Sequence, residues 1–168
     1  MKNLTRSAVS AIFPIVLAGV LVAGSLLGQA SAPKPSASSI EIKPIEPGDL
    51  PIPPDFRAAI YENLILEIKK TGKFEQVYRS GDKDAASLPN LVTLRTTAQS
   101  FKKGSQKKRE VTTVAGSTSI SLKVQITDRS GKMIVDQDVV GKVRFFGENL
   151  RATYDFSKKV AKLVQTKF

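Results

Sequence analysis

Cysteine and histidine are both absent from this chain of 168 residues. Without cysteine there is no disulfide, no thiolate nucleophile and no cysteine-based metal site. Without histidine the chain lacks the usual general base near neutral pH and the commonest metal ligand. Serine nucleophiles have no histidine partner, and there is no glycine-rich phosphate loop or dinucleotide fingerprint. These absences predict a protein that is not an enzyme and that uses neither a metal nor a cofactor.

The first 30 residues have the charged, apolar and small-residue order of a secretory signal peptide. Lys2 and Arg6 supply the positive end, residues 8–27 carry no charge, and small residues follow. We expect cleavage after Ala30, because an alternative site two residues later would leave proline as the first mature residue. The apolar run is also long enough to span a bilayer, so an uncleaved membrane anchor is the competing interpretation. Both interpretations predict export to the periplasm or cell envelope of a bacterium.

Positive charge dominates the part of the chain that follows the signal. Removing Lys2 and Arg6 from the 26 Lys and Arg leaves 24, against 15 Asp and Glu, for a formal charge of about +9. Such a charge attracts phosphorylated lipids, acidic glycans or nucleic acid, although export argues against nucleic acid. The alternative is that the charge only keeps the protein soluble.

Residues 31–39 (SAPKPSASS) have the composition of a flexible linker, and residues 40–168 are expected to form a single domain. Alternating apolar and polar residues indicate strands near 40–43, 74–78, 91–101, 119–127 and 133–145. Apolar stripes at helical spacing indicate one helix from Pro54 to Gly72 and another after Asn149. The order β-α-β-β-β-β-α predicts an α+β fold with a mostly antiparallel sheet and two helices packed on one face.

The clearest strand signal is the unbroken alternation at 119–127. It predicts that four residues face the core: Ile120, Leu122, Val124 and Ile126. A hairpin turn from Asp128 to Gly131 follows. The return strand carries apolar residues at odd positions, namely Met133, Val135, Val139, Val143 and Phe145. Gly141 shares that face, where we expect it to mark a bulge or bend.

Five positive charges lie within eight residues of the segment that joins the strands near 91–101 and 119–127. They are Lys102, Lys103, Lys107, Lys108 and Arg109. Near a membrane, each such charge contributes about 1 kcal/mol of attraction to anionic lipid. The alternative interpretation is a solvated hairpin tip whose charges oppose aggregation. These five residues are the candidate anion-binding site, in the form of a basic loop.

Four acids are the remaining candidates for chemistry: Asp128, which also suits the first position of the turn, Asp136, Asp138 and Glu148. Asp136 and Asp138 are two residues apart on a strand, so they share a face at a separation of about 7 Å. That spacing suits a hydrolytic carboxylate pair or a Ca²⁺ site. The alternative is a set of surface acids that pair with lysines across the sheet.

The junction before the final helix is a third candidate. Asn149 is expected to cap this helix, and an anion could bind at the amide groups of the helix start. Phe145 is expected in the core, and Phe146 is expected to pack under the basic loop.

Several short motifs carry a resemblance to a known family. They are Phe74-Glu-Gln-Val77 after a helix that ends at Gly72, Phe101-Lys-Lys-Gly104 with Arg109, Ala115-Gly116, and Asp128 with Gly131. On these motifs, most of residues 40–168 resembles the bacterial family named domain of unknown function 4410 (DUF4410). The resemblance implies an exported envelope protein with no assigned activity. Members of the family are often lipoproteins, and this chain departs from them because it has no cysteine to carry a lipid.

The leading hypothesis is therefore an exported, envelope-associated binding or assembly module whose basic loop meets an anionic partner. Contact with the membrane would come through the basic loop or through an uncleaved signal. One alternative is a hydrolase that acts on an envelope polymer through its carboxylates. Another is a structural subunit that pairs with a partner through a sheet edge.

Overall fold

The computed structural model describes residues 36–111, 116–143 and 148–168, all within one structural unit, Pro33–Phe168. Its elements follow in this order: β1 (Ser39–Ile42), α1 (Pro54–Lys70), β2 (Gln76–Arg79), β3 (Leu91–Lys102), α2 (Gln106–Val111), β4 (Thr118–Asp128), β5 (Met133–Val143) and α3 (Arg151–Lys167). A short 3-10 helix, Asp84–Ser87, lies between β2 and β3. The α+β class and the predicted order are confirmed, and α2 is an additional element. The predicted signal peptide, residues 1–30, lies outside the described residues, as do Phe145 and Phe146.

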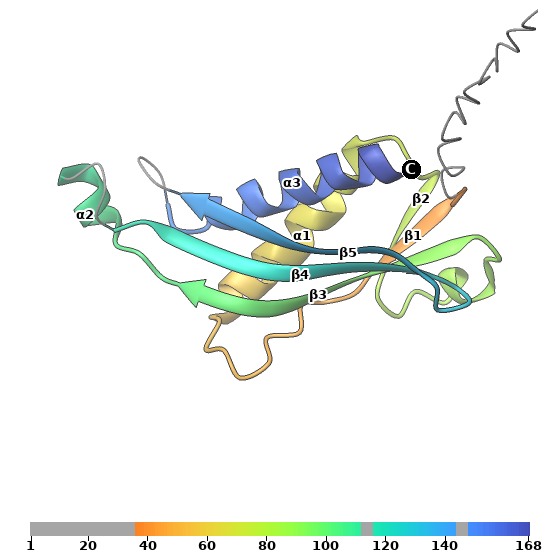
Figure 1. The fold of residues 1–168 in the computed structure, drawn as a ribbon, viewed down its shortest axis with the longest axis horizontal. Coiled ribbons are helices and arrows are strands. Elements are labelled where there is room, and N and C mark those ends of the chain that lie inside the picture. Colours follow the sequence, from red (N-terminus) through yellow and green to blue (C-terminus); the bar gives the residue numbers. More distant parts are fainter. Residues whose placement is uncertain (1–35, 112–115, 144–147) are drawn as a thin grey trace, which may run out of the picture. The chain divides into compact units, whose positions relative to one another are not determined.

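The five strands form one sheet in the order β2-β1-β3-β4-β5 (Figure 1). β3, β4 and β5 are antiparallel neighbours, whereas the short β1 is parallel to both β2 and β3. The antiparallel ladders are the longer ones, which confirms a mostly antiparallel sheet. After β1 the chain stays beside β3, and the backbone N–H groups of Lys43 and Glu46 donate to Leu94 O and Thr96 O at 2.9 Å each. The proline-rich segment thus partners β3 without forming a regular strand.

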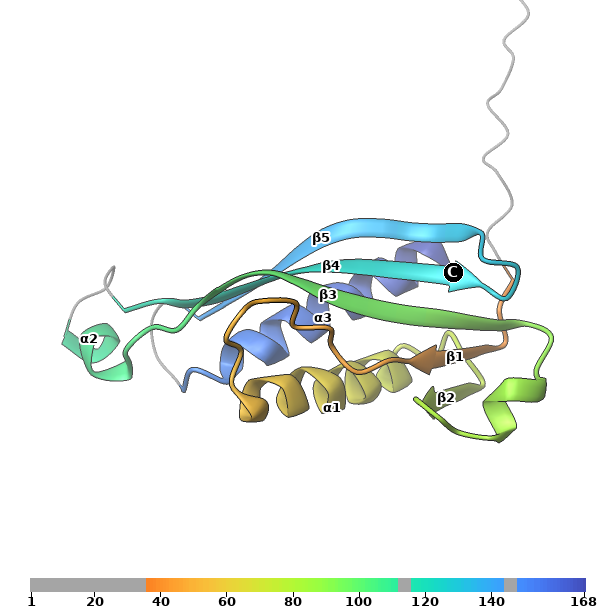
Figure 2. The same cartoon turned by 90° about the horizontal axis from the view of Figure 1, so that it is seen from below.

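Both long helices cover the same face of the sheet (Figure 2). The four alternating residues of β4 that the sequence placed in the core are completely buried: Ile120, Leu122, Val124 and Ile126. They belong to one apolar cluster with Phe56 and Leu64 of α1 and Phe156 and Val160 of α3. Full burial of one such side chain stabilises a fold by about 1.5–3 kcal/mol. The register and the two-layer arrangement predicted from the alternation are therefore confirmed.

Register shifts in the two ladders of β4 change which side chains reach the core. One lies between Ala98 and Ser100 of β3, and it allows Phe101 to pair with the buried Ile120. The other places Met133 opposite Thr127, so Met133 is 45% exposed and the expectation that it belongs to the apolar face is wrong. A bulge reverses the alternation of faces beyond it, and simple period-2 counting then fails.

Gly141 lies where α3 crosses β5. A Cβ atom on this residue would lie 2.1 Å from Ala152 O and 2.6 Å from the Cβ of Phe156. The ladder between β4 and β5 continues in register through Gly141. The glycine therefore serves close helix–sheet packing, and the expected bulge at this position is wrong.

No helix within the described ranges is long and apolar enough to cross a membrane.

Candidate functional site

The basic segment stands on a narrow backbone neck where β3 ends and β4 begins. Ser105 N donates to Gly116 O at 3.0 Å, and Gly104 N donates to the hydroxyl of Thr118 at 3.1 Å. The two arms are so close that a Cβ on Gly104 would lie 2.0 Å from Gly116 O. The Thr118 hydroxyl also donates to Asn149 Oδ1 at 2.7 Å, which ties the neck to the turn before α3. These bonds fix the base from which the segment projects.

Phe101, the second-last residue of β3, packs against helix α1. Its ring meets that of Phe56 edge-on, with centroids 5.0 Å apart, and Phe56 is only 2% exposed. Edge-on aromatic pairs add about 0.5–1.5 kcal/mol beyond the area that they bury. Lys102 follows directly, so the charged residues begin where the packed core ends.

The predicted anion-binding residues lie at the end of β3 and on α2, and we call residues 102–109 the basic tip. Lys102 is the last residue of β3, and Lys103 follows it. Lys107 and Lys108 lie on α2, so part of the predicted loop is helical (Figure 1). These four side chains are exposed. Arg109 also belongs to α2, and its side chain lies outside the part of the chain that the structure describes.

The acids singled out from the sequence do not form a cluster with metal-binding capacity. Asp136 accepts hydrogen bonds from Lys123 Nζ at 3.1 Å and from Gln125 at 3.4 Å, and Asp138 accepts one from Gln99 at 2.8 Å. Both acids lie on the open face of the sheet, and Glu148 is exposed before α3. No group of three or more acids that could hold a metal ion occurs among the described residues. The alternative interpretation, pairing with a lysine across the sheet, describes Asp136, whereas Asp138 binds a glutamine.

Asn149 does not cap α3, contrary to the expectation. The N-cap residue is Leu150, and it makes no side-chain capping bond. The side chain of Asn149 instead receives the hydroxyl of Thr118. The junction therefore braces the neck of the basic tip.

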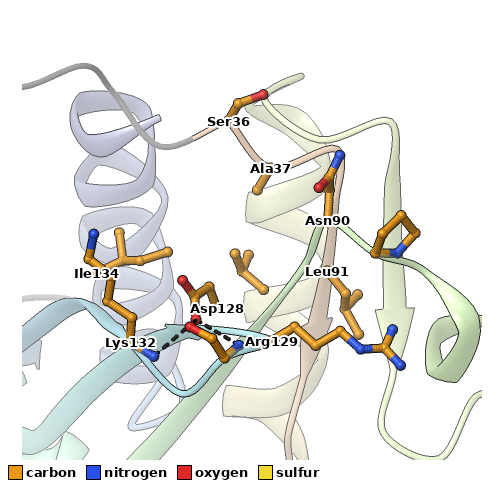
Figure 3. Close-up of a pocket in the computed structure, with 11 residues that line it drawn as sticks. Ser36, Ala37, Asn90, Leu91, Asp128, Arg129, Lys132 and Ile134 are labelled. Atoms are coloured by element: carbon orange, nitrogen blue, oxygen red, sulfur yellow. Dashed lines mark hydrogen bonds between the residues drawn. The ribbon is translucent and has the colours of Figure 1, made fainter.

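A cavity of about 630 Å³ lies at the opposite end of the sheet beside the β4–β5 turn (Figure 3). Two of its charged residues, Asp128 and Arg129, make hydrogen bonds that hold the local backbone. The Asp128 carboxylate accepts bonds from the Ser130 hydroxyl and from the N–H groups of Ser130 and Lys132, at 2.6–2.9 Å. These bonds, led by the one from the Ser130 hydroxyl, lower the pKa of Asp128. The Arg129 guanidinium donates to Leu88 O and Ala86 O. The cavity therefore presents no set of converging catalytic groups.

Two carboxylates that sequence reasoning missed are the most buried among the described acids, Glu41 and Glu67. Glu41 accepts hydrogen bonds from Lys43 Nζ at 2.6 Å and from Gly81 N at 3.2 Å. Glu67 pairs with Lys70 at 2.6 Å. The spacing of Glu67 and Lys70, three residues apart on a helix, is the signal that could have identified their pair.

The free edge of β5 is partly closed by α3. Asp155 accepts a hydrogen bond from Lys142 N at 2.9 Å, and Lys159 Nζ donates to Val140 O at 2.8 Å. Asp155 and Lys159 also pair with each other at 2.7 Å. These side chains occupy backbone groups that a neighbouring strand would need. The remaining edge carries Asp136 and Asp138, charges of the kind that discourage strand pairing.

No family model matches the chain, and no curated protein matches it in sequence. Solved bacterial structures do share the fold. PelC from Paraburkholderia phytofirmans, described as a dodecamer, has a TM-score of 0.58 at 10% identity, covering 77% of this chain and 88% of that one. A hypothetical protein from Chlamydia trachomatis has a TM-score of 0.55 at 12% identity, covering 79% and 98%. A Xanthomonas campestris protein, assigned to domain of unknown function 330, has a TM-score of 0.52 at 10% identity, covering 81% and 86%.

These likenesses establish the fold and leave the activity open. The resemblance to domain of unknown function 4410 stays a prediction, because no family model supports it.

Proposed function

We propose that this chain is an exported, envelope-associated binding module that uses its basic tip to meet an anionic envelope surface. The observation that carries the proposal is the position of Lys102, Lys103, Lys107 and Lys108. All four are exposed, and they project from a braced neck at one end of the sheet. A surface presented at the end of rigid strands can meet a partner without disturbing the core.

Val111 gives the tip an apolar element beside its charges. Its side chain is 84% exposed at the end of α2, three and four residues after Lys108 and Lys107. Residues at this spacing lie on the same side of a helix. Ammonium groups beside an exposed aliphatic side chain suit the boundary between anionic head groups and acyl chains. Anionic lipid is therefore the preferred partner, and acidic glycan is the alternative.

Two other proposals have less support. A hydrolase would need carboxylates that converge in a cleft, whereas Asp136 and Asp138 bind neighbouring side chains on the open face of the sheet. A subunit that pairs through a sheet edge would use β2 or β5, the two edge strands, and at β5 the side chains of Asp155 and Lys159 occupy backbone groups near Val140 and Lys142.

Co-sedimentation with vesicles tests the proposal. The tip variant replaces all five basic residues by serine: Lys102, Lys103, Lys107, Lys108 and Arg109. The charge-matched control replaces five exposed basic residues elsewhere: Arg57, Lys73, Lys83, Lys132 and Lys142. At low ionic strength the wild type and the control are expected to bind phosphatidylglycerol vesicles, and the tip variant is expected to bind weakly. Equal loss in both variants would mean that only net charge matters, and it would contradict a role for the tip. Binding by the wild type to acidic glycan alone would reject lipid as the partner.

A further inference from the structure

The positive charge of this protein has a second centre on α3. The helix carries Arg151, Lys158, Lys159, Lys162 and Lys167 against a single acid, Asp155. Its apolar stripe is buried against the sheet, so its charges lie on the faces that remain. Lys158 and Lys162 are both exposed and one helical turn apart, an arrangement in which like charges repel. An anion placed between them would relieve that repulsion.

A groove of about 420 Å³ runs between α3 and the end of α1, two helices that pack against each other. Lys70 enters it from α1, and Lys158, Lys159 and Lys162 enter it from α3. We call these four residues the lysine groove. Lysine side chains from two helices far apart in sequence thus line one groove, and Gln165 adds an amide to the lining. The volume is in the range of small-ligand sites.

Internal contacts hold some of these ammonium groups and leave others available. Glu67 binds Lys70 at 2.6 Å, and this hydrogen bond raises the pKa of Lys70, which keeps it charged. Lys159 is held by Asp155 and by Val140 O. Lys158 lies 5.3 Å from the centroid of the Tyr154 ring. Within the described residues, no carboxylate pairs with Lys158 or Lys162.

We infer that the lysine groove binds a compact phosphate group, such as a diphosphate or a phosphomonoester, with Lys158 and Lys162 as its principal contacts. Tetrahedral oxyanions can accept several ammonium donors at once, and charge-assisted bonds of this kind are the strong ones. Lys70 adds a third donor from the opposite wall. Glu67 limits the affinity, because its carboxylate lies at the wall that Lys70 occupies. The site is separate from the basic tip and does not depend on the proposed function.

Calorimetric titration with inorganic pyrophosphate at low ionic strength tests the inference. The five-serine tip variant serves as the background, so that the basic tip cannot bind the probe. We expect binding with one site per chain in this background. Adding Lys158→Ser and Lys162→Ser should weaken it roughly tenfold. The control, Lys83→Ser with Lys132→Ser, removes the same charge from exposed positions outside the groove and should change little. Glu67→Gln should strengthen binding, because it removes the repelling charge with little change of shape.

Each other result would overturn the inference. Absence of pyrophosphate binding in the background would exclude the site, and so would equal affinity in the groove variant and the control. Unchanged affinity in Glu67→Gln would place the anion away from this wall. A second arm uses phosphatidic acid vesicles in the same background. Vesicle binding that depends on Lys158 and Lys162 would identify a lipid head group as the source of the phosphate, and its absence beside pyrophosphate binding would identify a soluble ligand.

Discussion

The β4–β5 connection turns within residues 129–132, whereas the β3–β4 connection runs through residues 103–117. The short turn uses all of its residues for structure. Asp128 accepts bonds from Ser130 and Lys132, and Gly131 adopts a φ of 85° that favours glycine. In the long connection, the strands are joined by the neck, where Gly104 bonds to Thr118 and Ser105 bonds to Gly116. Chain length beyond what a connection requires is typical of segments that carry function.

β4 lies between the two connections, and the largest change in the free energy of unfolding is expected there. Leu122 is completely buried near the middle of β4, and its replacement by alanine should lower the free energy of unfolding by about 2–5 kcal/mol. Lys123→Ala should cost about 1 kcal/mol or less, because the ion pair of Lys123 with Asp136 is exposed. Urea denaturation of both variants measures the difference. Equal losses would contradict the observed register.

Substitutions in the neck of the basic tip should destabilise the fold. In Gly104→Ala the new Cβ would meet backbone atoms of Gly116 and Ser117, which move only if the two arms separate. We expect a loss of about 1–3 kcal/mol in the free energy of unfolding, measured by the same urea titration. If Gly104→Ala were as stable as the wild type, the neck would not be closed in solution and the tip would have no fixed base.

The short turn should show a dependence on pH. Hydrogen bonds, first that from the Ser130 hydroxyl, hold the pKa of Asp128 below its usual value. A carboxyl group whose pKa is lower in the folded state adds stability above its unfolded pKa, and this stability disappears as the pH falls through the folded pKa. The Tm of the wild type should therefore exceed that of Asp128→Ala at about pH 7, and the gap should narrow as the pH falls below the usual pKa of an aspartate, about 3.9. A gap that stayed constant over this range would mean that the ionised carboxylate does not hold the turn.

The smallest effect is expected at the tip itself. The tip variant with five serines should keep the Tm of the wild type within about 2 °C, since exposed charges contribute little to folding. Thermal denaturation followed by circular dichroism measures this. A large fall in Tm would mean that the basic residues belong to the structure, and the contrast between the two connections would not hold.

The sequence predicted those features that depend only on residues close together in the chain. The alternation from Ile120 to Ile126 predicted a buried strand face, and Gly131 predicted the turn. The parallel pairing of β1 between β2 and β3 joins segments distant in sequence, so no local pattern contains it. The register shift before Phe101 and the contact of Gly141 with α3 likewise depend on a partner element.

The candidate sites divide in the same way. The basic tip is one short segment of the sequence with five positive charges in eight residues, so it could be singled out from the sequence, although α2 could not. The lysine groove combines Lys70 with Lys158 and Lys162, and only the packing of α1 against α3 brings them together.

The salt dependence of vesicle binding tests the central claim, that the basic tip binds anions and does not support the fold. Salt screens exposed charges over about 8–10 Å at physiological ionic strength, so binding through several ammonium groups must weaken as salt is added. The association constant with phosphatidylglycerol vesicles is measured across a series of salt concentrations for the wild type, the tip variant and the charge-matched control. The account predicts a steep decline for the wild type and the control and a shallow one for the tip variant. Equal slopes for the wild type and the tip variant would contradict it.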